Sequence, residues 1–218
     1  MAANFLDLPG ELRNRIYKLC LLHKEPLALW TGFNQRHELC PSILRANKTL
    51  HHEASSLFYA YNCFDFTIAT PKQIALFLRT IGRKNAEYIQ HLYVEFPRFY
   101  YQEPGDITVS DDSISIFSSI QCSCANLSTL TAFTSSAPTI EFELNEKDNP
   151  GSIYKALKLV DTLFRATSPF LKRIIVGVYD DRPSKFITEM ENCGWIIKAT
   201  KIQFSLPLSS ELELSLCP

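Results

Sequence analysis

The sequence predicts an α+β to α/β protein, in which a helical N-terminal segment precedes helices and strands that alternate along the chain. Apolar residues recur every three or four positions over 8–22, 71–82 and 152–167, as they do on one face of a helix. Short apolar or alternating runs such as "HLYVEF" and "RIIVGVY" lie between the later helices and are typical of strands. Helix–strand pairs of this kind favour a mixed or parallel sheet with helices packed on it.

The first expected element is a helix over residues 8–22. Leu8, Leu12, Ile16 and Leu19 fall on one face of this helix. Pro9 suits the first helical turn, where its missing N–H costs nothing. Residues 24–40 show neither the helical spacing nor the alternation typical of a strand, and we expect a loop or a short strand there.

A second helical region begins near Pro41. Its apolar residues again recur at helical spacing: Leu50, Ala54, Leu57, Phe58 and Tyr61. The segment "CFDF" then predicts a short strand. Thr70 and Gln73 form a capping-box pattern that opens the next helix, and Gly82 ends it.

The remaining elements follow in the same manner to the end of the chain. We expect strands at 89–96, 126–133, 139–144, 173–179 and 195–202, with an edge strand at 211–216. We expect helices at 113–124, 152–167 and 183–194, and a polar, aromatic loop at 97–112. The continuous apolar run at 173–179 predicts a strand covered on both sides.

The helices and strands form loosely repeated units at 71–96, 113–134, 152–179 and 183–202. Their unequal lengths predict either a degenerate, leucine-rich-repeat-like array or ordinary α/β packing without repeats. We therefore expect two regions, a module at 1–66 and a helix–strand region at 67–218, packed as one continuous unit.

Composition narrows the classes of function. With a formal net charge of −1, the protein has no overall positive field that would attract nucleic acid or an anionic membrane, so we expect neither as a partner. Seven cysteines at irregular spacing predict reduced thiols in a reducing compartment. With no secretory pattern and no run as long as a membrane span, we expect a cytoplasmic or nuclear protein.

No motif in the sequence indicates catalysis, and we expect no enzyme, no cofactor and no metal. The segment "HHE" (51–53) has adjacent histidines, whereas a zincin helix needs them one turn apart. Cys122 and Cys124 lack the second pair that a structural zinc site normally has. Asp180 and Asp181 follow a strand without a phosphate loop, which favours a solvated turn.

A group of aromatic residues beside a base is the sequence's candidate substrate surface. It comprises Arg98, Phe99, Tyr100 and Tyr101. Such residues can stack on nucleobases, anchor a protein interface or simply pack under a loop. The absence of a basic stripe favours a protein partner.

Two phrases, "FLDLPGELRNRIYKLCL" (5–21) and "ILRANKTLHHEASSLFYAYNCFDF" (43–66), carry a resemblance to a known family. The first resembles the opening of an F-box, and both are similar to a group of fungal F-box-like proteins. The resemblance covers residues 5–66. It implies an F-box-like helical module that binds the Skp adaptor of a cullin-RING ubiquitin ligase, while the C-terminal region holds a substrate. Leu8, Pro9, Leu12 and Ile16 would then face the adaptor.

Two functions follow as hypotheses. The chain is a ubiquitin-ligase substrate receptor, or it is an adaptor-independent fungal binding protein or effector that acts on a host protein. In the second case the face of Leu8, Leu12 and Ile16 would pack into the core against residues 71–202.

Overall fold

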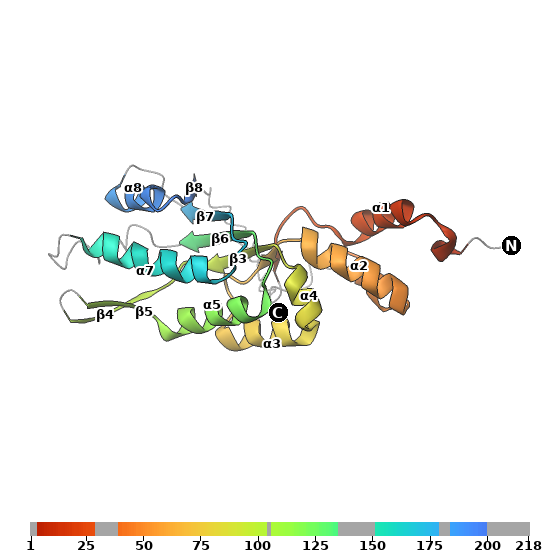
Figure 1. Cartoon of the computed structure of the whole chain (residues 1–218), viewed down its shortest axis with the longest axis horizontal. Coiled ribbons are helices and arrows are strands. Elements are labelled where there is room, and N and C mark those ends of the chain that lie inside the picture. Colours follow the sequence, from red (N-terminus) through yellow and green to blue (C-terminus); the bar gives the residue numbers. More distant parts are fainter. Residues whose placement is uncertain (1–3, 29–38, 104–105, 135–150, 179–183, 200–218) are drawn as a thin grey trace, which may run out of the picture.

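A computed structural model describes residues 4–28, 39–103, 106–134, 151–178 and 184–199. Its main feature is a six-stranded sheet in which every neighbouring pair is parallel (Figure 1). The strands, in spatial order, are β1 (Leu27–Ala28), β2 (Phe64–Asp65), β3 (His91–Glu95), β6 (Thr129–Thr134), β7 (Arg173–Val178) and β8 (Ile196–Ala199). Spatial order follows chain order throughout, so each unit adds its strand beside the strand before it. The predicted fold class is confirmed.

This strand order places the connecting helices in one layer. Crossovers between parallel strands are right-handed, and successive steps in one direction therefore put every crossover on the same face. Four helices follow this rule: α3 (Pro71–Ile81), α5 (Asp111–Ser123), α7 (Ser152–Ala166) and α8 (Lys185–Asn192). Each packs against the next one along the chain. The opposite face of the sheet carries no helix from the described residues, and we call it the open face.

Alternate burial along β3 distinguishes the two faces of the sheet. Leu92 and Val94 are buried in the core under the helices, whereas His91, Tyr93 and Glu95 point to the open face and are half-buried. The centre of the core is aromatic. The Phe164 ring lies 5.3–6.1 Å, between ring centroids, from the rings of Phe96, Phe117 and Trp195.

Local sequence signals explain where the helices begin and end. At the start of α3, the Gln73 amide donates to the Thr70 hydroxyl, and the Thr70 amide donates to the Gln73 side chain at 2.9 Å. This confirms the predicted capping box. Gly82 ends α3 at φ 80° and ψ 157°, a conformation that only glycine adopts readily, and α4 (Arg83–Tyr88) follows at once.

The N-terminal region is a small helical module at one end of the molecule, beyond the sheet (Figure 1). It consists of the 3₁₀ turn η1 (Phe5–Asp7), α1 (Gly10–Leu21), the 3₁₀ turn η3 (Pro41–Arg45) and α2 (Lys48–Tyr61). Its own apolar cluster is formed by Tyr17, Leu21, Leu50, Ala54 and Leu57. Phe58 packs against both this cluster and the main core, so the module is continuous with the sheet region.

The structure differs from the sequence prediction at three places. Residues 97–112 form not a loop but an antiparallel hairpin of β4 (Phe99–Glu103) and β5 (Asp106–Val109). Prolines at both ends of "PRFYYQEPG" conceal the strand signal. Pro9 lies at the N-cap of α1 instead of in its first turn. The helical region near Pro41 is divided at Asn47, whose side chain accepts from the Leu50 amide and caps α2.

Several predicted features lie outside the described residues. They are the strands at 139–144 and 211–216 and the acidic pair Asp180 and Asp181.

Candidate interaction surfaces

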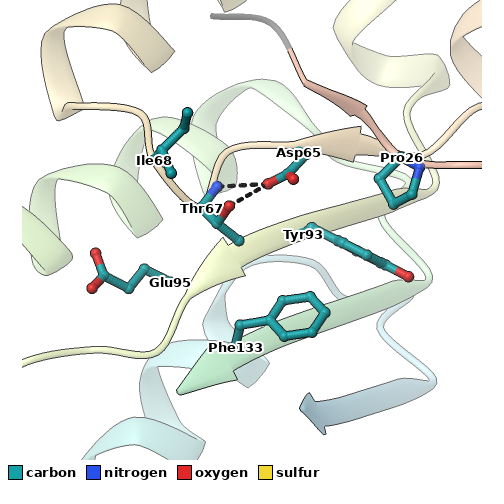
Figure 2. A pocket seen from close by; sticks show the side chains of 7 residues that line it. All are labelled: Pro26, Asp65, Thr67, Ile68, Tyr93, Glu95 and Phe133. Carbon is teal, nitrogen blue, oxygen red and sulfur yellow. Dashed lines mark hydrogen bonds between the residues drawn. The ribbon is translucent and has the colours of Figure 1, made fainter. Parts of the chain in front are cut away.

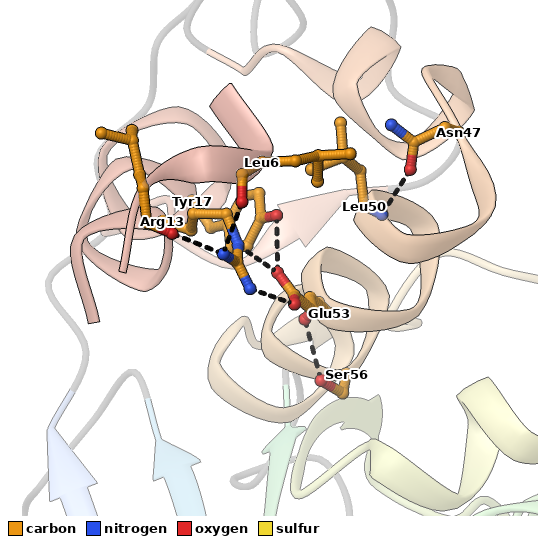
Figure 3. Close-up of polar contacts among 8 residues, drawn as sticks. Leu6, Arg13, Tyr17, Asn47, Leu50, Glu53 and Ser56 are labelled. Atoms are coloured by element: carbon orange, nitrogen blue, oxygen red, sulfur yellow. Dashed lines mark hydrogen bonds and ion pairs between the residues drawn. The ribbon is translucent and has the colours of Figure 1, made fainter. Parts of the chain in front are cut away.

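The inner side of α1 is fixed to α2 by a polar network that centres on Glu53 (Figure 3). Arg13 donates to both carboxylate oxygens of Glu53, from Nη2 at 2.6 Å and from Nε at 2.9 Å. The Tyr17 hydroxyl donates to Glu53 Oε2 at 2.9 Å. A bidentate arginine–carboxylate pair with a third donor fixes both the spacing and the rotation of the two helices.

The same arginine also holds the Leu-Pro turn that precedes α1. Arg13 Nη1 donates to the backbone carbonyl of Leu8 at 2.6 Å and lies 3.4 Å from that of Leu6 (Figure 3). One guanidinium therefore joins three segments of the module. This role explains why an arginine and a tyrosine stand four residues apart within "ELRNRIY", where one helical turn brings both to the same carboxylate.

The network changes the acidity of its members. Hydrogen bonds from Arg13 are the main cause that lowers the pKa of the Glu53 carboxyl. Burial, with the hydrogen bond to Glu53, raises the pKa of Tyr17 to about 12. Glu53 is therefore ionised and Tyr17 is protonated at neutral pH, which is the state that the hydrogen bonds require.

A second link joins the carboxyl ends of the two module helices. The buried side chain of Asn62 donates to the carbonyl of Leu21 at 2.8 Å and accepts from the amide of His23 at 2.9 Å. It also donates to the Phe58 carbonyl at 3.0 Å. Asn62 thus satisfies backbone groups that the ends of α1 and α2 leave unpaired.

The side of α1 that turns away from α2 is apolar and open to solvent. Leu12, Ile16 and Leu19 form one stripe at helical spacing, which we call the outer face of α1. Leu12 is 47 % exposed and Leu19 is 78 % exposed, while Ile16 is half-buried. Pro9 is exposed and Leu8 is half-buried at the start of this stripe. Of the predicted adaptor residues, Pro9 and Leu12 are therefore exposed and Leu8 and Ile16 are half-buried, and Leu12 does not pack into the core.

The predicted substrate residues lie on the hairpin, at the opposite end of the molecule from α1 (Figure 1). Tyr100 is exposed, whereas Phe99 is half-buried against the core, 6.4 Å from the Phe96 ring. Arg98 pairs with Glu95 at 2.9 Å. Tyr101 is the register partner of Ile107 in the hairpin. The structure thus places Tyr100 and Arg98 at the surface, but it uses Phe99 as part of the core.

The residues that suggest other chemistry have structural partners. Glu53 of the "HHE" segment binds Arg13, and the ring of His51 contacts the Leu44 carbonyl at 2.8 Å. Burial raises the pKa of the Cys124 thiol to about 12, while Cys122 is exposed. The described residues contain no group of three or more histidines, cysteines and acids placed to hold a metal ion.

A hollow of about 380 Å³ lies on the open face of the sheet, where β2, β3 and β6 end (Figure 2). It is lined by Pro26, Asp65, Thr67, Ile68, Tyr93, Glu95 and Phe133. The sequence alone does not reveal this hollow, since its residues come from four segments that only the strand register brings together. The alternation of polar and apolar residues in "HLYVEF" was the available signal, because it marks which side chains leave the core.

Comparison of this chain with protein-family models, with curated proteins and with solved structures found no match in any of the three. Within the described part of the chain, no helix combines the length and the apolar composition needed to cross a bilayer.

Proposed function

We propose that this chain is a non-enzymatic protein–protein interaction module that docks on an adaptor protein through the outer face of α1. The observation that carries the proposal is the contrast between the two sides of this helix. Its inner side is secured by Tyr17, Leu21 and the Arg13–Glu53 pair, whereas its outer side presents Leu12 and Leu19 to solvent. Exposed apolar stripes on a fixed helix are typical of surfaces that bind a partner.

The adaptor that this surface fits is the Skp adaptor of a cullin-RING ubiquitin ligase. This part of the proposal depends on the resemblance of residues 5–66 to fungal F-box-like proteins, together with the exposure of Pro9 and Leu12. The helix–strand region would then hold the substrate protein, and the chain would act as a substrate receptor inside the cell.

Co-purification with the Skp adaptor tests the proposal. We expect the wild-type chain to retain the adaptor and the Leu12→Asp/Leu19→Asp variant to lose it, because two charges would enter an apolar contact. Both positions are exposed, so the variant should keep its fold. Leu159→Asp is the matched control, since Leu159 is 42 % exposed on α7, far from α1 (Figure 1). Failure of the wild type to bind, or undiminished binding by the folded double variant, would contradict the proposal.

A second candidate function is adaptor-independent binding, as in an effector that acts on a host protein. The half-burial of Leu8 and Ile16 favours it, because a free docking helix would leave these residues open. The module would then be an integral part of the fold, and partners would contact the open face of the sheet. In this case the double variant would keep every partner that the wild type retains.

A further inference from the structure

The hollow on the open face combines two aromatic walls with two carboxylates (Figure 2). Tyr93 and Phe133 lie on neighbouring strands, with ring centroids 5.2 Å apart and planes inclined at 59°. Asp65 is the register partner of Tyr93, and Glu95 is the register partner of Phe133. The strand pairing therefore places one acidic residue next to each aromatic residue, although the Glu95 side chain points away from the two rings (Figure 2).

The Asp65 carboxylate is fixed in place before any ligand arrives. Its Oδ1 accepts from the Thr67 amide at 2.8 Å and from the Thr67 hydroxyl at 2.6 Å. Its Oδ2 accepts no hydrogen bond from the described residues. A carboxylate held by hydrogen bonds loses little further entropy on binding, which favours recognition of a cation.

The lining of the hollow carries no positive charge to match these acids. None of its seven residues is basic. Arg98 reaches Glu95 from the rim, but its side chain is 73 % exposed, so this surface pair is weak and open to competition. Burial raises the pKa of Tyr93, and the nearby carboxylates of Asp65 and Glu25 add to this effect. The lining of the hollow thus combines aromatic rings with acidic side chains.

From this geometry we propose that the hollow binds the side chain of an arginine in a partner protein. A guanidinium is planar and stacks on aromatic rings, and its donors fit the planar carboxylate of an aspartate such as Asp65. A bare metal ion does not fit, since the described residues offer no group of three acidic, histidine or cysteine ligands. The inference rests on the proposed function in one respect, namely that this chain binds proteins.

Peptide titration of the full chain tests this site directly. The probe is the blocked tripeptide acetyl-Gly-Arg-Gly-amide, and the control is the same peptide with citrulline, which keeps the shape but lacks the charge. We expect the ring resonances of Tyr93 and Phe133 to shift and saturate with a Kd on the order of 1 mM. The citrulline peptide should bind at least about tenfold more weakly.

Two variants make the test specific. Asp65→Asn/Glu95→Gln should weaken arginine binding about tenfold or more, while the amide oxygen that the first substitution introduces can still accept from Thr67 and preserve the fold. Glu87→Gln is the matched control, because Glu87 is 37 % exposed and pairs with Arg83 at 2.9 Å, as Glu95 is 41 % exposed and pairs with Arg98. Its affinity for the arginine peptide should equal that of the wild type.

Three results would each overturn the inference: no saturable shift of the two rings, equal binding of the arginine and citrulline peptides, or unchanged binding by the double variant. The outcome is independent of the adaptor experiment, which uses the outer face of α1. A chain that retains the adaptor but ignores the arginine peptide would refute this site alone. A chain that binds the arginine peptide but does not retain the adaptor would refute the proposed adaptor binding and support this site.

Discussion

The hydrogen bond from Tyr17 to Glu53 offers the sharpest test of how α1 is held. Tyr17→Phe keeps the buried ring, 5.7 Å from the ring of Phe5, and removes only the hydroxyl that donates to the carboxylate at 2.9 Å. Hydrogen bonds to charged groups contribute about 1.5–3 kcal/mol. Because the Glu53 side chain is 28 % exposed and water can replace the lost donor, we expect the lower end, about 1.5 kcal/mol.

Urea unfolding followed by circular dichroism measures this loss, and heating should show a decrease in Tm of about 3–6 °C for a chain of this size. Tyr61→Phe is the matched control, since Tyr61 is exposed on α2 and its hydroxyl donates to none of the described residues. A double-mutant cycle of Tyr17→Phe with Glu53→Ala should give a coupling of about 1 kcal/mol. Additive effects, or a Tyr17→Phe variant as stable as the wild type, would refute the argument that this hydrogen bond secures the helix.

Three further predictions concern the core, a helix end and the sheet. Phe164→Ala should cost about 3–5 kcal/mol and alter the fluorescence of Trp195, whose ring lies 5.4 Å away, whereas Phe170→Ala on the surface should be nearly neutral in urea unfolding. Gly82→Ala should cost about 1–3 kcal/mol through backbone strain alone, because an added Cβ would meet no atom within 4 Å, while Gly10→Ala in α1 should not destabilise the chain. Burial, with the charges of Arg173 and Lys198, lowers the pKa of His91 to about 4. Between about pH 6.5 and pH 4, His91 is therefore protonated in the unfolded chain but neutral in the folded chain. Stability measured by urea unfolding should therefore fall as the pH drops from about 6.5 to about 4, and this loss should be smaller in His91→Gln than in His52→Gln, which alters an exposed histidine.

Local signals were sufficient to predict most of the helices and strands. The capping box at Thr70 and Gln73, the apolar face of 152–167 and the alternation of 91–96 depend on contacts between residues close in sequence, and all three appear in the structure. The hairpin at 99–109 was missed because its strands are short and prolines interrupt the pattern. Its stability depends on pairing across the turn, which no single strand reveals.

The sequence by itself determined that this chain forms helices followed by helix–strand units, because helical period, alternation and caps act within a few residues. Only the tertiary structure decided what the individual side chains do. The helical spacing places Arg13 outside the apolar face of α1. In the structure its side chain nevertheless binds Glu53, forty positions away along the chain, and the backbone carbonyl of Leu8. Asp65, Tyr93, Glu95 and Phe133 meet in one hollow because the parallel register aligns three strands. Strand order and register arise from packing between distant segments, and these contacts leave no period in the sequence.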